Sequence, residues 1–466
     1  MSGGPHPAGG ARLPVRVHAG ATLRLAGPVM VSRAGTLLLF TCDTVMTGRV
    51  GGHELAFLGL GLAIQSILMM VAIGVLQGSL VLSSQAYGAN DFKACGRVWR
   101  VAMIHAGCIG LVFAVVCIFG EQILSMLGQD PVLAQGGGTV SLQFAWGMPG
   151  MLMYTASTYF LESTQRPRVS MVVMMLANIL NFLLNGALIY GWGGLTGPLG
   201  AAGAVMGTSL VRWGTAFAVI GYIVWSIWRT GEDRFGVRAP IAAWTEDIAT
   251  FGGGIGRQMR RLGAATALTY GLEAGAFSAL VLLAGLLGPV PLAAHQITTN
   301  AFAMIGMMAI GMASATAVRV GYAVGRRNRP DMRRAGWVGA GLGAAFMVPA
   351  AIILVGAPAW IVSIYVKDPA VEEIARWTIR AAGSFIILNG VMTVLLGALR
   401  GLGDVWIPML LHLMAFWVVG VPAAWLFASY LDLGAIGLQL GLALAILVSM
   451  TAQIVRFHNI SYEPPA

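Results

Sequence analysis

Long apolar stretches alternate with short polar segments along almost the whole chain, and this pattern predicts twelve membrane-spanning helices. A helix needs about 20 apolar residues to cross a bilayer. Charged residues, glycine and proline punctuate the polar breaks between the stretches. The expected spans are residues 24–48, 55–85, 98–120, 138–161, 170–191, 199–228, 262–287, 291–318, 336–358, 375–398, 406–429 and 434–456.

The composition agrees with this pattern and excludes a soluble protein. Hydrophobic residues make up 57% of the 466 residues and charged residues only 10%, against about 45–50% and about 25% in soluble proteins. Most of the chain therefore cannot face water, and we expect an all-α integral membrane protein. The 64 glycines suit such a protein, because small residues let membrane helices approach closely.

The basic residues predict the orientation in the membrane. With a cytoplasmic N-terminus, 22 of the 28 Lys and Arg residues fall in inner segments and four in outer segments, while Arg33 and Arg212 lie inside spans. Cytoplasmic loops carry such an excess of positive charge. We therefore expect a multi-pass protein of the inner (plasma) membrane with both termini in the cytoplasm. Nucleic acid is not an expected partner, because no aromatic platform is interleaved with the arginines.

An internal repeat predicts two halves. A shift of 237 residues places 72–74 (AIG) on 309–311 (AIG), and a shift of 234 places 199–207 on 433–441. We expect two six-helix bundles in parallel repeat around a central cleft, where transporters of this kind bind substrate. The predicted divisions are a disordered N-terminal tail at 1–20, an N-lobe at 21–228, a linker at 229–261, a C-lobe at 262–457 and a C-terminal tail at 458–466.

Two acidic residues, Asp43 and Glu273, lie inside the predicted spans, whereas the other sixteen lie in loops, tails or span ends. A carboxylate at the bilayer centre costs about 2.5–3.5 kcal/mol, so each of the two is a functional candidate. Glu162 lies at the end of a span and is expected to be a solvated cap.

Depth along the helices predicts that Asp43 meets Asn181, Asn185 and Thr208. The two asparagines share one helix face, and Thr208 lies about 13 Å below the outer end of its helix. Such oxygens suit a hard cation, with Na⁺ as the candidate metal ion. An occluded aspartate also suits a proton carrier, because burial disfavours the charged form. The alternative is a hydrogen-bond clamp between helices, worth about 0.6 kcal/mol per contact in membranes.

Glu273 is expected about 10 Å nearer the membrane middle than Asp43. That depth fits direct contact with a cationic substrate. The alternative is an ion pair with Arg33 or Arg212, whose positions inside spans have no other explanation in the sequence.

Three prolines, Pro28, Pro149 and Pro422, interrupt predicted helices and predict kinks, because proline removes a backbone hydrogen bond. Pro28 lies on the helix that carries Asp43. A kink there would allow the helix to change shape when Asp43 changes charge.

Several segments, in their order and spacing, resemble the multidrug and toxic compound extrusion (MATE) family. The resemblance extends over essentially the whole chain from about residue 20. It implies two six-helix bundles that form a V-shaped cleft and export organic cations or drugs by alternating access, in exchange for inward Na⁺ or H⁺. The segments are GPVMVSRAGTLLLFTCDTVMTGRVGG (27–52), SQAYGAN (84–90), LANILNFLLNGALIYG (176–191), LAAHQI (292–297), RVGYAVGRRN (319–328) and GALRGLGD (397–404).

The resemblance also implies a coupling-ion site in the N-lobe. Asp43, fifteen residues after the matching Pro28, corresponds to the acid of that lobe in the family. Asn181, Asn185 and Thr208 correspond to polar positions around it. These four residues are therefore the expected cation-coupling site.

For substrate binding the resemblance implies Glu273, together with Pro28 and Asn389. Glu273 precedes His295 by 22 residues, as the glutamate of the C-lobe does in the family. Some members carry a second aspartate at the position of Asn389, eleven residues before Arg400. This departure puts a cation site in the C-lobe in question and favours Asp43 for ion coupling.

A cation-coupled antiporter is thus the expected function, with no cofactor and no catalytic residue. Its expected partners are small organic cations and membrane lipids, and it is expected to work as a monomer. The alternatives are a lipid-linked precursor flippase of the same wider superfamily and a major-facilitator transporter. The latter should carry an Asp-Arg motif where residues 88–100 read GANDFKACGRVWR. No P-loop or membrane-enzyme polar cluster is present in the sequence.

Overall fold

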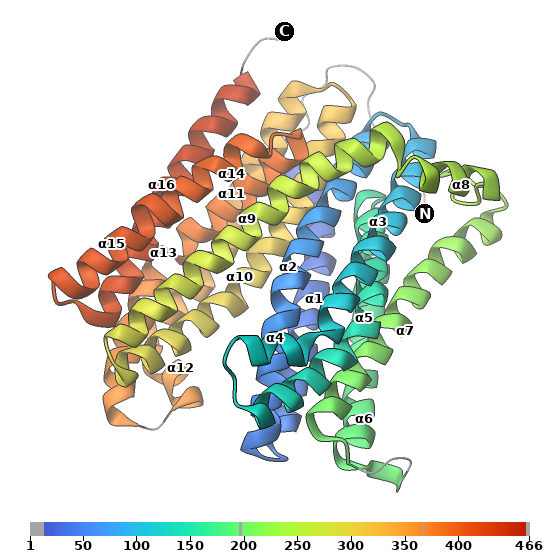
Figure 1. Cartoon of the computed structure of the whole chain (residues 1–466). Coiled ribbons are helices and arrows are strands. Elements are labelled where there is room, and N and C mark those ends of the chain that lie inside the picture. The colour runs from blue at the N-terminus through green and yellow to red at the C-terminus, as the bar shows by residue number, and fades with distance from the viewer. Residues whose placement is uncertain (1–13, 195–197, 367, 463–466) are drawn as a thin grey trace. The chain divides into compact units, whose positions relative to one another are not determined.

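The computed structural model describes residues 14–194, 198–366 and 368–462, and within these ranges the chain is helical and has no strand (Figure 1). The first half contains α1 (Val15–Gly48), α2 (Gly52–Gly88), α3 (Phe92–Ile118), α4 (Gly120–Met126), α5 (Pro131–Ser163), α6 (Pro167–Tyr190), the 3₁₀ turn η1 (Trp192–Gly194), α7 (Gly200–Thr230) and α8 (Ile241–Ala249). The second half contains α9 (Gly253–Leu286), α10 (Pro289–Gly325), α11 (Arg329–Gly356), α12 (Pro358–Tyr365), α13 (Pro369–Leu402), α14 (Trp406–Leu413), η2 (Met414–Gly420), α15 (Val421–Trp425), η3 (Leu426–Tyr430) and α16 (Gly434–Tyr462).

Each of the twelve expected spans lies mainly within a helical segment of the structure. Among the described residues, eleven segments are long and apolar enough to cross a membrane, and they include Trp406–Tyr430 as one segment. The remaining expected span, 138–161, lies in α5, which is rich in glycine, serine and threonine and is mostly buried. The chain is therefore a multi-span, all-helical membrane protein, as predicted.

The less apolar sequence of α5 fits its interior position. It packs between α3 and α7 (Figure 1) and so meets protein along much of its length. Its polar groups find partners on α3: Ser141 Oγ donates to the Cys117 carbonyl at 2.9 Å, and Trp99 Nε1 donates to Ser157 Oγ at 3.2 Å. Away from water, backbone and side-chain polar groups must be satisfied inside the protein in this way.

The helices continue across Pro28 in α1 and Pro149 in α5. Around Pro422 the backbone is irregular, because the wide π-helical segments η2 and η3 flank the short α15. A proline lacks the N–H of the helical ladder and its ring crowds the preceding turn, which accounts for a change of helical pitch at this point.

The chain divides by its contacts into two compact units, which we describe separately. The first unit comprises residues 1–27, 84–91 and 276–466, and the second comprises residues 28–83 and 92–275. The division thus falls before Pro28 in α1 and after Gly275 in α9. The predicted lobe limits at 21–228 and 262–457 stay a prediction.

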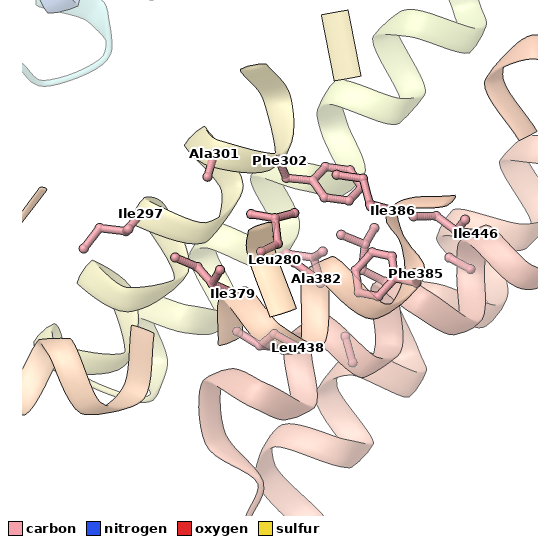
Figure 2. Close-up of a cluster of buried hydrophobic side chains, with 14 of the residues drawn as sticks. Leu280, Ile297, Ala301, Phe302, Ile379, Ala382, Phe385, Ile386, Leu438 and Ile446 are labelled. Atoms are coloured by element: carbon pink, nitrogen blue, oxygen red, sulfur yellow. The ribbon is translucent and has the colours of Figure 1, made fainter. Parts of the chain in front are cut away.

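The first unit has a large apolar core. Figure 2 shows Leu280, Phe302, Phe385 and Ile446, which come from α9, α10, α13 and α16 and converge in this core. The rings of Phe302 and Phe385 lie 5.6 Å apart. Close packing of α10 against α13 depends on a glycine in α13, Gly397, because a Cβ there would collide with the backbone of α10.

The start of the chain is more ordered than its composition suggested. The expected tail at 1–20 is wrong for its last residues, because α1 begins within it and His18 is fully buried in the first unit. His18 Nε2 lies 3.0 Å from the carboxylate of Asp331, and Arg319 Nη2 lies 3.3 Å from His18 Nδ1. These contacts hold the first turns of α1 in place. The rest of the predicted tail lies outside the described residues, apart from Pro14.

The end of the chain differs from expectation in the same way. Helix α16 continues to Tyr462, so the tail predicted at 458–466 is wrong for its first five residues. Phe457 is fully buried and packs edge to face against Trp337 with the ring centroids 5.5 Å apart, which anchors the last turns. The last four residues lie outside the described residues.

The predicted linker at 229–261 is structured and belongs to the second unit. Its helix α8 is attached to α3 by Asp247, which lies 3.4 Å from Arg97 Nε and 3.2 Å from Arg100 Nε. Arg100 also donates to the Gly236 carbonyl at 2.7 Å. Because Asp247 and Arg100 are both buried, this attachment is part of the folded unit.

Candidate functional site

Helices α1, α6 and α7 of the second unit bring the four predicted coupling residues together. Asp43 comes from α1, Asn181 and Asn185 lie one turn apart on α6, and Thr208 comes from α7. Each of these side chains is at most 1% exposed. Gly207 leaves the room that the cluster needs, because a Cβ at that position would lie 2.8 Å from Asn185 Oδ1.

Three side chains donate hydrogen bonds to the carboxylate of Asp43. Asn185 Nδ2 donates to Oδ1 at 2.7 Å, and Thr208 Oγ1 donates to Oδ2 at 2.6 Å. Asn181 Nδ2 is shared, since it lies 3.4 Å from Asp43 Oδ1 and 2.9 Å from Thr208 Oγ1. We call these four side chains the Asp43 cluster.

The cluster is arranged to stabilise a negative charge at a buried position. Donors to a carboxylate favour its charged form, whereas burial disfavours that form. The oxygen Oδ1 of Asn185 is buried and has no hydrogen-bond partner among the described residues. A proton on Asp43 Oδ2 would require Thr208 to accept a hydrogen bond where it now donates one. The cluster therefore has two possible hydrogen-bond patterns. Thr208 donates to the charged carboxylate in one, and accepts from the protonated carboxyl group in the other.

Groups of three or more His, Cys, Asp or Glu side chains that could hold a metal ion are absent from the described part of the chain. The Asp43 cluster could offer a monovalent cation only one carboxylate, the Thr208 hydroxyl and amide oxygens. In the present arrangement both amides donate within the cluster through Nδ2, and Asn181 Oδ1 accepts from Asn185 Nδ2 at 3.4 Å. A turn of the Asn185 amide would direct its oxygen toward a cation beside the carboxylate.

Glu273 and Asn389 belong to different units of the chain. Glu273 lies on α9 in the second unit and is half-buried. Asn389 lies on α13 in the first unit and is buried, with 7% of its surface exposed. The hydrogen bonds of Asp43 go to the three residues described above and not to Glu273. The substrate-binding role of Glu273, Asn389 and Pro28 stays a prediction.

Glu162 differs from its expected role as a solvated cap. It is only 2% exposed and accepts a hydrogen bond from Arg33 Nη2 at 3.1 Å. The guanidinium of Arg33 also lies over the ring of Tyr159, 5.4 Å from the centroid. Arg33 thus pairs with Glu162 rather than with Glu273. The signal in the sequence was Arg33 itself, because a mid-span arginine requires a carboxylate nearby.

A layer of buried polar residues in the first unit was not predicted. His295 Nδ1 lies 3.1 Å from Gln439 Nε2, and the hydroxyls of Thr298 and Thr378 lie 2.7 Å apart. These contacts join α10 to α16 and to α13. In the sequence, the only local sign of this polar layer is that His295 and Thr298 share one helix face. Their partners, Gln439 and Thr378, are far away in the sequence.

These features define a multi-span helical membrane protein with a buried polar cluster around a carboxyl group inside one of its two units. The MatE family model matches residues 28–186 and 265–426. The chain belongs to the MatE family, as the resemblance of its motifs indicated. Members of this family are transporters, so the protein is a transporter and not an enzyme.

Curated relatives match over nearly the full length. The chain is 32% identical over 438 residues to the probable multidrug resistance protein NorM of Pseudomonas putida, covering 93% of this chain and 92% of that protein. It is 33% identical over 448 residues to the multidrug resistance protein NorM of Burkholderia vietnamiensis, covering 95% and 94%.

Solved structures share the fold at lower sequence identity. A MATE protein in complex with MaL6 has a TM-score of 0.86 at 17% identity, covering 95% of this chain and 96% of that chain. The eukaryotic MATE transporter AtDTX14 has a TM-score of 0.83 at 19% identity and covers 97% of both chains. The predicted fold class is confirmed by these similarities.

Proposed function

We propose that the protein is a multidrug efflux transporter that exports organic cations or drugs in exchange for inward H⁺ or Na⁺. The observation that carries this proposal is the Asp43 cluster, a carboxylate about 1% exposed that receives three hydrogen bonds within membrane-spanning helices. The names of the two relatives described above, both multidrug resistance proteins, support drugs as the substrate class. The protein works in the plasma membrane with both termini in the cytoplasm, as the basic loops indicate.

Asp43 is the site of the coupling cation in this proposal. With H⁺, the proton binds a carboxylate oxygen, and Thr208 changes from donor to acceptor at Asp43 Oδ2. With Na⁺, the carboxylate, the Thr208 hydroxyl and a turned asparagine amide surround the cation. In both cases the cation removes the net charge of Asp43 and changes the hydrogen bonds between α1, α6 and α7.

Helix α1 is the element that transmits this change. Asp43 and Pro28 lie on the same helix, about 22 Å apart at 1.5 Å per residue. Pro28 provides no N–H to the helical ladder, so bending costs less there than elsewhere in α1. The boundary between the two compact units also lies here, because the second unit begins at Pro28. A change in the packing of Asp43 therefore alters α1 at the point where it passes from one unit to the other.

Glu273 binds the exported cation in this proposal, and the substrate-binding roles of Asn389 and Pro28 rest on the family resemblance alone. A half-buried carboxylate attracts an organic cation more strongly than it would in water, since the local dielectric is lower. Exchange of one monovalent organic cation for one H⁺ or Na⁺ moves no net charge, so the concentration gradient of the coupling ion drives it without ATP. Each additional coupling ion that enters down the membrane potential adds about 2.3 kcal/mol per 100 mV. No further subunit is needed for this scheme, so we expect a functional monomer.

The test is export from proteoliposomes that contain the purified full-length chain. Ethidium, a fluorescent organic cation, is loaded, and an H⁺ or a Na⁺ gradient is imposed separately. We expect one of the gradients to drive ethidium movement, and we expect Asp43→Asn to lose at least about 90% of it while remaining folded.

A matched control uses Asp130→Asn, because Asp130 caps the start of α5 and is exposed. Asparagine is an equally good helix cap, so this variant should transport normally. Gradient-driven export by Asp43→Asn at the wild-type rate would remove Asp43 from the mechanism. An unresponsive wild type would refute the antiport and favour a gradient-independent flippase.

A further inference from the structure

Arg212 is a buried arginine within a membrane-spanning helix. It lies on α7, one helical turn beyond Thr208, and is only 6% exposed. Its guanidinium carbon lies over two aromatic rings, 5.1 Å from the centroid of Phe144 and 6.0 Å from that of Phe40. Phe40 precedes Asp43 by three residues on α1, so these contacts place Arg212 beside the Asp43 cluster.

The charge of Arg212 is not cancelled by a direct ion pair. Within the described ranges no carboxylate lies within 4.0 Å of its nitrogens, and its Nη1 is buried without a hydrogen-bond partner. Arg33, the other arginine inside a span, has Glu162 at 3.1 Å. A buried charge in a membrane helix is costly, and one without a direct partner requires a functional or structural reason.

Asp43 is the ionisable side chain that acts most strongly on Arg212. The next is the thiol of Cys117, which is fully buried on α3. The other titratable group beside Asp43 is the thiol of Cys42, on the same helix. Neutral thiols at physiological pH leave Asp43 as the negative charge that Arg212 faces.

We propose that Arg212 is the fixed counter-charge of the Asp43 cluster and limits how tightly this site holds any cation. The proposal rests on the proposed antiport at Asp43. Without a bound cation, Asp43 and Arg212 carry opposite charges that balance. When H⁺ or Na⁺ neutralises Asp43, the positive charge of Arg212 remains and disfavours the bound cation. The site can therefore release its coupling ion, which a transporter must do in every cycle.

The sign of this effect separates it from a structural role. If Arg212 only filled space between Phe40 and Phe144, its replacement would loosen the cluster and weaken cation binding. If its charge opposes cations, its replacement by a neutral side chain strengthens cation binding and slows release. In this account Arg212 does not itself bind the ion. Its positive charge acts on the ion through Asp43, so Arg212 is a positioning residue.

The experiment compares Arg212→Met and Arg212→Lys in full-length protein reconstituted into proteoliposomes. Met preserves length and apolar contact with the two rings, whereas Lys preserves the charge. Ethidium export is measured against the concentration of whichever ion, H⁺ or Na⁺, drives the wild type. We expect Arg212→Met to lower the half-saturating ion concentration about tenfold and to lower the maximal rate, because the charge that opposes the bound cation is removed.

Arg212→Lys should keep the wild-type half-saturating concentration. A matched control for general loss of positive charge is Arg380→Met, because Arg380 lies exposed on α13 in the first unit. It should leave the half-saturating concentration unchanged. If Arg212→Met is not recovered as folded protein, Arg212→Gln, which is also neutral, is measured in the same way.

Binding in detergent provides a readout that does not depend on transport. Purified wild type and variants are titrated with Na⁺ and with acid, and cation binding is measured at equilibrium. Tighter binding by the neutral variants supports the counter-charge, whereas unchanged or weaker binding overturns it. A wild type that binds a cation but ignores both gradients would refute the antiport, and the direction of the Arg212→Met effect in this assay would still decide the proposal.

Discussion

Replacing Thr208 by valine tests the Asp43 cluster at its shortest hydrogen bond. The change removes the hydroxyl that donates to Asp43 Oδ2 at 2.6 Å and leaves a side chain of nearly the same shape. It also removes the acceptor of Asn181 Nδ2 at 2.9 Å. Hydrogen bonds to charged groups contribute about 1.5–3 kcal/mol, so the charged form of Asp43 should lose roughly that much stabilisation.

The direction of the effect identifies the coupling ion. If the ion is H⁺, the charged form loses a stronger hydrogen bond than the neutral one, worth about 0.5–1.5 kcal/mol, that the protonated form makes to Thr208. The half-saturating H⁺ concentration for export therefore falls about fivefold. If the ion is Na⁺, the cation loses one of its few oxygen ligands, and the half-saturating Na⁺ concentration rises. Ethidium export from proteoliposomes at a series of pH values and Na⁺ concentrations distinguishes the two cases.

Thr208→Ser is the control for this prediction, because serine keeps the hydroxyl and removes only a methyl group. It should stay within about threefold of the wild type in half-saturating concentration. If Thr208→Val changed neither the H⁺ nor the Na⁺ dependence of export, the cluster would not be the coupling site. The reasoning from its hydrogen bonds would then be refuted.

Two further predictions concern the folded state. Glu162→Gln leaves Arg33 buried without its carboxylate and should destabilise the protein by about 3–5 kcal/mol, seen as a lower unfolding temperature in detergent; the double variant Arg33→Gln/Glu162→Gln should recover at least half of that loss, and no recovery would contradict a specific pair. Gly397→Ala should lower the yield and stability of folded protein because the added Cβ collides with the backbone of Ala313, whereas Gly306→Ala on α10 faces open space and should be neutral. Equal stability of the two alanine variants would contradict this close helix contact.

The fold and the Asp43 cluster could be predicted from the sequence because both depend on regular helices. Apolar runs indicate the spans, and a rise of 1.5 Å per residue gives the depth at which Asn181, Asn185 and Thr208 lie. The structure places these side chains within hydrogen-bond distance of Asp43. Their role in ion coupling stays a prediction.

Other features could not be predicted because they depend on contacts between distant segments. Glu162 resembled a solvated cap until Arg33, 129 residues away, was seen to reach it. The start of α1 resembled a tail because its anchor, Asp331, lies in a different helix. In both cases local composition indicated exposure to water, whereas a contact with a residue far away in the sequence buries the side chain.

In the central claim, the protein exchanges an organic cation for an inward-moving H⁺ or Na⁺ that binds at Asp43. An exchanger must also run in reverse, so an imposed ethidium gradient should move the coupling ion across proteoliposomes that contain wild-type protein. This flux is followed with an internal pH dye and with radioactive Na⁺. We predict ion movement opposite to ethidium in the wild type and none in Asp43→Asn, while Asp130→Asn behaves as the wild type. Ethidium movement without any counter-flow of either ion, or equal counter-flow in Asp43→Asn, would contradict the account.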